Sequence, residues 1–129
     1  MAANTKNDLK RMEVKYVRDK AKALYPYGTE CAICGTTEAL ELHHFSSLTL
    51  LWERWKKENA ITINDVDDVM FHREIFIAEH QVQLYEEVVT LCNAHHQRLH
   101  SIYGIKPGLH TASKQKNWIE VQKNKATKA

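Results

Sequence analysis

The sequence lacks any segment that a membrane or a secretion pathway would recognise. Its beginning, MAANTKNDLKRMEVKYVRDK, alternates charged and apolar side chains and contains no apolar signal-peptide core. No run approaches the ~18 apolar residues that cross a membrane. We therefore expect a soluble, intracellular protein, cytoplasmic in its host and without a membrane partner. A length of 129 residues predicts one domain, and the chain shows no internal repeat.

Cysteine is scarce: the chain contains only Cys31, Cys34 and Cys92. In a reducing compartment three cysteines do not form a closed set of disulfides, and a CxxC pair accompanied by clustered histidines indicates a metal site. A redox-active CxxC normally begins a helix within a βαβ pattern, and the sequence lacks that pattern. A disulfide scaffold is therefore the weaker interpretation.

A large excess of either charge is also missing, because the formal net charge is only +2. The charges are nevertheless unevenly distributed. Residues 1–24 carry seven Lys and Arg against three Asp and Glu, residues 114–129 carry five Lys against one Glu, and the middle carries six against twelve. Basic ends around an acidic centre suit termini that contact a polyanion and a centre that binds cations, although solvated helix faces would give the same pattern.

Apolar spacing predicts an α+β domain that is mostly helical with one short hairpin. Helices are expected over residues 7–24, 47–60, 62–81, 93–104 and 111–123, and strands within 38–45 and over 87–92, with residues 124–129 frayed. In the third helix the apolar residues expected to face the core are Val66, Val69, Met70, Ile75 and Ile77. The first of the two strands carries a histidine pair at its end.

A gap of two residues between possible metal ligands occurs twice in the sequence. Cys31 and Cys34 make a CxxC pair, and Cys92 with His95 repeats the two-residue gap with a histidine as its second member. Two such knuckles make a closed Cys3His set, which is the arrangement of structural Zn²⁺ sites. The spacing leaves open whether His95 or His96 is the fourth ligand.

The remaining histidines suggest a second metal site. His96 and His100 are four residues apart, so they project from one face of a helix and can converge on one ion. His43 and His44, at the end of a strand, can supply a third ligand and a free base. The alternative is that these histidines only support the zinc knuckles or lie on the surface.

The order CxxC, LHHF and TLCNAHHQRLH resembles the HNH endonucleases of the ββα-metal (His-Me finger) superfamily that carry a two-knuckle zinc site, a type common in phages and mobile elements. The resemblance covers residues 31–43 and 87–103. It implies a zinc-clamped ββα-metal core over 29–104, with a helical insertion over 47–81. A basic N-terminal helix over 1–28 and a basic C-terminal helix and tail over 105–129 complete a single domain over 1–129.

The resemblance also implies roles for individual residues. His43 takes the position of the first metal ligand, His44 that of the general base, His96 that of the closing histidine and His100 that of an extra ligand. The middle Asn of the motif falls on Glu87, which departs from the family pattern. A carboxylate there would orient His44, bind the ion or play no part in catalysis.

These roles describe a metal-dependent nuclease that hydrolyses DNA to leave 5′-phosphate and 3′-hydroxyl ends. A neutral imidazole is a competent base near neutral pH, and a divalent ion relieves charge on the phosphate. Histidine ligands suit Zn²⁺, Ni²⁺ or Mn²⁺, whereas the family suggests Mg²⁺ or Mn²⁺. Arg98 and Lys106 are the local candidates for DNA contacts. The rival function is a non-catalytic zinc-knuckle module that binds nucleic acid or protein. The oligomeric state is left open, a homodimer included.

Overall fold

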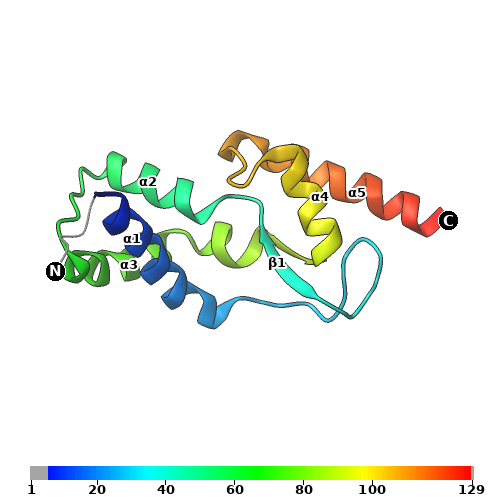
Figure 1. The fold of residues 1–129 in the computed structure, drawn as a ribbon, viewed down its shortest axis with the longest axis horizontal. Helices are drawn as coiled ribbons and strands as arrows, with labels where there is room; N and C mark the ends of the chain where they lie inside the picture. Colours follow the sequence, from blue (N-terminus) through cyan, green and yellow to red (C-terminus); the bar gives the residue numbers. More distant parts are fainter. Residues whose placement is uncertain (1–5, 129) are drawn as a thin grey trace.

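Helices make up most of residues 6–128, the part of the chain that the computed structural model describes. In chain order the elements are α1 (Lys6–Ala21), η1 (Lys22–Leu24), β1 (Leu40–His44), α2 (Leu48–Glu58), α3 (Val66–Glu79), η2 (Val82–Glu86), β2 (Val88–Cys92), α4 (Asn93–Tyr103), η3 (Leu109–Thr111) and α5 (Ala112–Lys128). The molecule is elongated, with α1, α2 and α3 at one end and α5 reaching the other (Figure 1). The predicted α+β class, mostly helical around a two-stranded hairpin and a Cys3His cluster, is confirmed.

The hairpin pairs two strands that are far apart in the sequence. β1 and β2 are antiparallel, with Leu40 opposite Cys92 and His44 opposite Val88. Because side chains alternate along a strand, His43 is buried while its neighbour His44 points to the other face. β2 leads directly into α4 at Cys92, so β1, β2 and α4 form a ββα unit and α2, α3 and η2 are inserted between its strands.

The inserted helices and α1 share a core of their own. Trp52 is fully buried, stacks on Trp55 at a ring distance of 5.5 Å and meets the edge of Phe76 at 5.2 Å. Helix α2 begins at its predicted cap, because the Ser47 hydroxyl accepts a hydrogen bond from Leu50 N. A π-helical turn, η2, follows α3. None of the helices within residues 6–128 is long and apolar enough to cross a membrane.

A buried carboxylate ties α1 to α2. Glu13 is only 3% exposed and accepts hydrogen bonds from Trp52 Nε1 at 3.0 Å and from Lys56 Nζ at 2.7 Å. Because the charge of Glu13 is satisfied only when both partners are in place, this network determines how α1 lies against α2.

Two expectations about the helices were wrong. Met70 and Ile75 are exposed rather than inward-facing, whereas Phe76 is fully buried. The buried stripe of α3 runs through Val69, Phe76 and Ile77, and a step of one residue turns a helix by about 100°, which carries Met70 and Ile75 away from it. Residues 124–128 are helical rather than frayed, because α5 meets no glycine or proline before Lys128.

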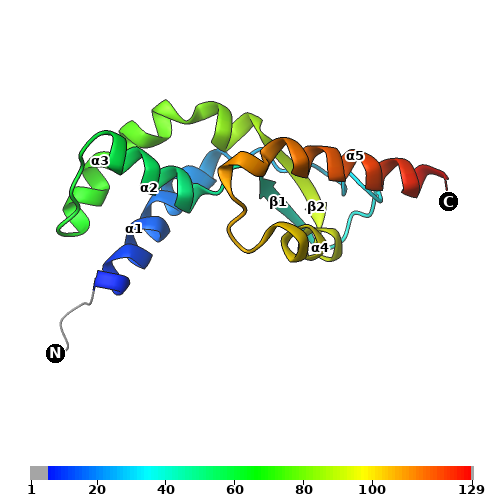
Figure 2. The same cartoon turned by 90° about the horizontal axis from the view of Figure 1, so that it is seen from above.

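The second core lies under the hairpin. Phe45, Leu91, Leu99 and Ile119 are buried together with Cys31 and Cys92. Figure 2 shows α5 lying alongside the hairpin and α4, and Ile119 is its buried anchor in this cluster. α5 therefore closes the side of the ββα unit on which the histidines of β1 and α4 lie.

Candidate metal centres and active-site cleft

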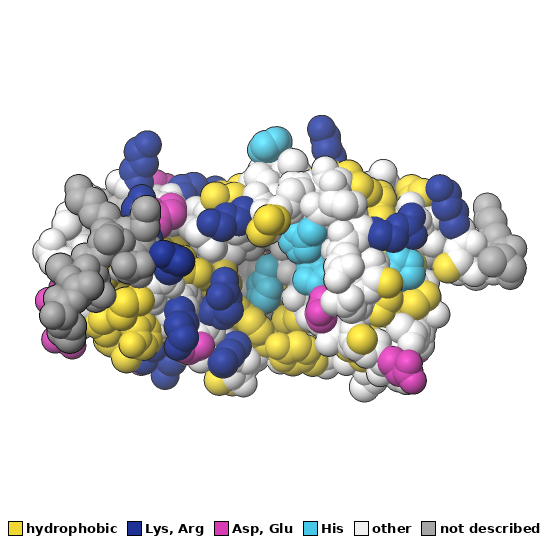
Figure 3. All heavy atoms as spheres, viewed as in Figure 1, with side chains coloured by type: hydrophobic (Ala, Val, Ile, Leu, Met, Phe, Trp, Pro, Cys, Tyr) yellow, Lys and Arg dark blue, Asp and Glu magenta, His cyan; other side chains and the backbone are white. Residues whose placement is uncertain are grey.

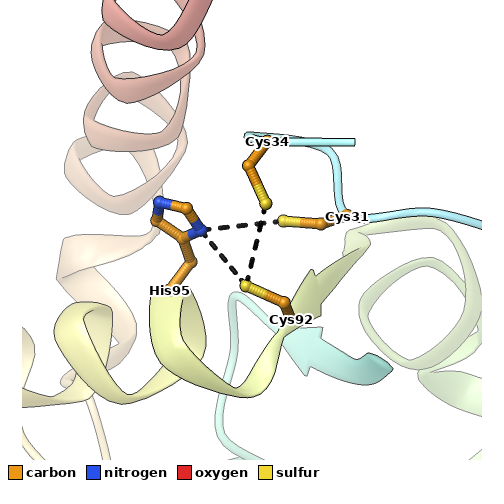
Figure 4. A group of neighbouring side chains, drawn as sticks. All are labelled: Cys31, Cys34, Cys92 and His95. Carbon is orange, nitrogen blue, oxygen red and sulfur yellow. Dashed lines mark hydrogen bonds between the residues drawn. The ribbon is translucent and has the colours of Figure 1, made fainter. Parts of the chain in front are cut away.

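Three sulfurs and one imidazole converge at the end of the hairpin. Cys31, Cys34, Cys92 and His95 offer ligand atoms that all lie within 4.8 Å of one another. Their side chains point toward a common centre, although they come from a loop, a strand end and the first turn of α4 (Figure 4). The structure thus places His95, and not His96, beside the sulfurs.

The local backbone explains how the CxxC segment presents both thiols. Gly35 N donates to Cys31 O at 2.9 Å and Cys31 N donates to Thr36 O at 2.8 Å, which folds the segment into a tight knuckle. Gly35 has a φ of +75°, in the left-handed region that favours glycine. Although burial opposes it, backbone N–H groups of Cys34, Cys92 and Ile33 lower the pKa of the Cys31 thiol.

The distances within this cluster fit a tetrahedral metal site. Sulfurs bound to Zn²⁺ at about 2.3 Å lie about 3.8 Å apart. Cys34 Sγ and Cys92 Sγ are 4.0 Å apart, and His95 Nδ1 lies 3.2 Å from Cys92 Sγ and 3.9 Å from Cys31 Sγ. Burial lowers the pKa of His95, which keeps its imidazole in the neutral form that binds metals.

A second cluster joins β1 to α4. His43 Nδ1 lies 3.1 Å from His96 Nε2, which lies 3.0 Å from His100 Nε2. The spacing of four residues on α4 puts His96 and His100 on one face, and the hairpin register brings His43 to them. These three histidines, which we call the histidine cluster, form the other group of metal-ligand atoms among residues 6–128.

The buried member of the histidine cluster is held by a glutamine from α5. Gln115 is fully buried and its side-chain nitrogen donates to Phe45 O at 3.2 Å and to Thr111 Oγ1 at 2.9 Å. Its oxygen therefore faces His43 and accepts a bond from His43 Nε2 at 2.7 Å. Burial, together with the neighbouring imidazoles, lowers the pKa of His43 to about 4, so this ring is neutral near pH 7.

The other two rings are oriented in the same manner. His96 Nδ1 donates to the Glu41 carboxylate at 2.7 Å, and His100 Nδ1 donates to the Gly104 carbonyl at 2.8 Å. Hydrogen bonds from Asn93 and His96 lower the pKa of Glu41, so its carboxylate stays ionised. Each of the three rings thus donates the single N–H of its neutral form to an oxygen acceptor.

In the histidine cluster the lone pairs of His43 Nδ1, His96 Nε2 and His100 Nε2 therefore face one another. Lone pairs only 3.0–3.1 Å apart repel unless a cation lies between them, and nitrogens bound to one ion at about 2.0–2.1 Å and near right angles lie about 3 Å apart. Histidine ligands in proteins characteristically donate their second ring N–H to a carboxylate or carbonyl. The donor set therefore fits one divalent cation.

His44 lies beside the histidine cluster and has a different environment. Its Nε2 donates to the buried carbonyl of Leu84 at 3.0 Å, so Nδ1 carries the lone pair. Its ring lies 4.5 Å from the ring of Tyr25, and burial lowers the pKa of His44 below its ordinary value. His44 is therefore neutral near pH 7 and able to accept a proton at Nδ1.

These side chains line one cleft of about 300 Å³ between the helical end and the ββα unit. Its lining residues are Arg18, Tyr25, Tyr27, Leu42, His43, His44, Ser47, Leu48, His96, His100, Ile105 and Pro107. Figure 3 shows histidine side chains in a hollow near the middle of this face. A molecule that enters the cleft meets the histidine cluster and His44 together.

The structure gives the Glu87 side chain a partner on α5. Its carboxylate accepts a bond from Lys116 Nζ at 3.2 Å, and it joins neither group of metal-ligand atoms. The carbonyl of Leu84 orients His44. Leu84 belongs to the π-helical turn η2, which ends one residue before Glu87 and precedes β2.

The sequence did not single out two residues whose side chains bond to the histidine cluster, Glu41 and Gln115. Glu41 lies two residues before His43 on the same face of β1, which is a weak sequence signal for a supporting carboxylate, whereas no local pattern indicates Gln115.

The two candidates for DNA contacts lie apart from each other. Arg98 does not line the cleft but packs its guanidinium 5.9 Å from the Trp118 ring centre. Lys106 lines a neighbouring groove.

Comparison with known protein families gives a match over the whole chain. A family model for phage T5 nicking endonucleases, described as the nicking endonuclease family, matches residues 1–129. No solved structure matches the chain. Because the match spans the cysteine cluster, the histidine cluster and both basic ends, it accounts for the chain as a whole. The chain belongs to the nicking endonuclease family.

Proposed function

We propose that this nuclease nicks DNA by an HNH-type mechanism in which His44 is the general base and His43, His96 and His100 hold one divalent ion. Membership of the nicking endonuclease family makes the protein a nuclease that cleaves DNA. The observation that carries the finer proposal is the convergence of three imidazole lone pairs, beside a fourth imidazole whose Nδ1 also carries a lone pair, in one cleft.

The protein's own groups account for the proton transfer. His44 Nδ1 takes a proton from water, while the Leu84 carbonyl stabilises the imidazolium that results by accepting the bond from Nε2. The lowered pKa of His44 keeps the ring deprotonated before the reaction. Water that attacks the phosphorus and displaces the 3′ oxygen leaves 5′-phosphate and 3′-hydroxyl ends.

The two metal sites have separate tasks in this proposal. A divalent ion held by the histidine cluster would polarise the phosphate and stabilise the leaving oxygen. Because all three of its protein ligands are imidazoles, we expect Mn²⁺, Ni²⁺ or Zn²⁺ to bind it more tightly than Mg²⁺. The Cys3His cluster would hold structural Zn²⁺. We further propose that residues 1–129 act as a single nuclease domain, because the cleft is lined by α1, β1, α2 and α4 together.

Supercoiled plasmid tests the reaction directly. Protein cleared of weakly bound metal is expected to convert supercoiled DNA to the open-circular form with Mn²⁺ restored, more slowly with Mg²⁺ and not without metal. DNA ligase should then reseal the nick, because ligation requires adjacent 5′-phosphate and 3′-hydroxyl ends. Nicking without any divalent ion would contradict the metal-dependent mechanism, and nicks that ligase does not reseal would contradict the proposed products.

The buried glutamine offers a test of the metal site that does not depend on activity. In Gln115→Leu, His43 loses the acceptor for its Nε2–H, and we expect Mn²⁺ affinity to fall about 10- to 100-fold by calorimetric titration. Gln115→Glu retains an acceptor and is expected to bind Mn²⁺ more tightly than Gln115→Leu.

The matched control is Gln97→Leu, since Gln97 is exposed on α4 and its side chain donates to Asn93 Oδ1. This variant is expected to bind Mn²⁺ as the wild type does. Equal affinity in the Gln115→Leu and Gln97→Leu variants, with unchanged circular dichroism, would show that the histidine cluster is not the Mn²⁺ site.

A further inference from the structure

A second groove adjoins the cleft on the side of α1. It encloses about 480 Å³ and is lined by Lys10, Arg11, Val14, Arg18, Thr49, Leu50, Glu53 and Lys106. Figure 3 shows Lys and Arg side chains gathered beside the histidine-lined hollow, over the helical end of the molecule. Arg18 lines both the groove and the cleft, so the two are continuous.

Three of the four cations that line this groove form no ion pair with a carboxylate among residues 6–128. Elsewhere on α1 and η1, Lys15 and Lys22 pair with Asp19, and Lys20 pairs with Glu74. Among residues 6–128, Lys10, Arg18 and Lys106 form no such ion pair. The acid in the groove, Glu53, pairs with Lys56 at 3.3 Å.

Arg18 connects this charge to the reacting groups. Its side chain lines the cleft together with His44 and Tyr25. Among the described residues that line the cleft there is no carboxylate, whereas Arg18 of α1 carries a positive charge. An anion in the cleft is therefore attracted toward α1.

The length of the groove matches a nucleic acid strand. From Lys10 to Arg18 the helix rises about 12 Å at 1.5 Å per residue, and the phosphates of one B-form strand follow every 3.4 Å along the axis, so the stripe spans about three to four phosphates. The buried network of Glu13 holds α1 in place, so these cations are presented by a rigid element.

We propose that Lys10, Arg11, Arg18 and Lys106 bind the sugar–phosphate backbone of the DNA strand that is cut, with Arg18 contacting a phosphate beside the scissile one. The inference rests on the proposed function, because it takes the histidine-lined cleft as the place of cleavage. It assigns substrate binding to one flank of the cleft and leaves the basic C-terminal helix without a direct role in it.

Salt-dependent DNA binding tests this assignment. In a His44→Ala background, which removes cleavage, the four groove residues are changed together to glutamine and binding to a short fluorescent duplex is measured by anisotropy over a salt series. The matched control changes Lys114, Lys116, Lys123 and Lys125 on α5 to glutamine, which lowers the net charge by the same four units. Circular dichroism establishes that both variants are folded.

The groove variant is expected to bind about 100-fold or more weakly at ~0.1 M salt, with the slope of log K against log salt reduced by about 3.6, because each of the four lost phosphate contacts removes about 0.9 from it. The α5 variant should retain the wild-type slope. An unchanged slope in the groove variant, or an equal loss in the α5 variant, would overturn the assignment.

Cleavage separates this inference from the proposed function. In the otherwise unchanged enzyme, Arg18→Gln is expected to slow nicking about tenfold at ~0.1 M salt while leaving Mn²⁺ affinity unchanged, because it removes one phosphate contact and no metal ligand. If the wild-type enzyme nicks DNA but Arg18→Gln nicks equally fast, the groove assignment fails and the proposed function stands. If wild-type protein does not nick with any divalent ion, the proposed function fails, and the placement of Arg18 beside a scissile phosphate fails with it.

Discussion

A His44→Ala variant is expected to lose DNA nicking by a factor of about 10²–10⁴ while keeping both metals and the fold. The loss follows from the position of His44 Nδ1, which carries a lone pair in the cleft because Nε2 donates to Leu84 O. The structural cost is small, because the substitution removes one hydrogen bond worth about 1 kcal/mol and part of the contact with Tyr25. Plasmid nicking rates and metal content measured on the same preparation test this prediction.

His110→Ala is the matched control, because His110 is exposed and does not line the cleft. It is expected to nick at the wild-type rate. His44→Gln adds a second comparison, since an amide can still donate to the Leu84 carbonyl but is too weak a base to deprotonate water. Nicking at the wild-type rate by either His44 variant would remove this residue from the proton-transfer step.

The histidines of α4 supply the second large effect, because His95 belongs to one group of metal-ligand atoms while His96 and His100 of the same helix belong to the other. His95→Ala is expected to release zinc and to destabilise the protein by several kcal/mol, since structural Zn²⁺ contributes folding free energy directly. The apolar core of the ββα unit is small, with Phe45, Leu91, Leu99 and Ile119 as its main residues, so it replaces little of what the metal contributes. Zinc content and thermal unfolding followed by circular dichroism measure the loss.

His100→Ala is the control for this effect, because it removes an imidazole from the same helix without touching the sulfur cluster. It is expected to keep zinc and a melting temperature near the wild-type value, but to bind Mn²⁺ weakly and to nick slowly. His95→Ala should instead lower the melting temperature by about 10 °C or more. If both variants retained zinc and stability equally, the Cys3His cluster would not be a structural metal site.

Much of this arrangement could be predicted from residue spacing, because the relevant signals are local. The CxxC gap, the repeated gap from Cys92 to His95 and the four-residue step from His96 to His100 each lie within one turn of backbone, where the geometry depends on few neighbours. Alternating and helical periodicities likewise predicted the hairpin and the helices between its strands. Boundaries and inward faces were less well predicted, as Met70 and Ile75 show.

What the sequence by itself predicted was therefore which cysteines and histidines could act as ligands and which histidine could act as the base, whereas the tertiary structure decided how each ring is held. Gln115 reaches His43 from 72 residues away, and the carbonyl of Leu84 accepts the bond from His44 across 40 residues. A backbone carbonyl is present in every residue and an amide side chain is common, so the sequence does not indicate which of them bonds to a histidine. The groove that joins Lys10 and Arg18 to Lys106 likewise exists only because α1 packs on α2 beside the loop after α4, and packing between distant segments has no local signature.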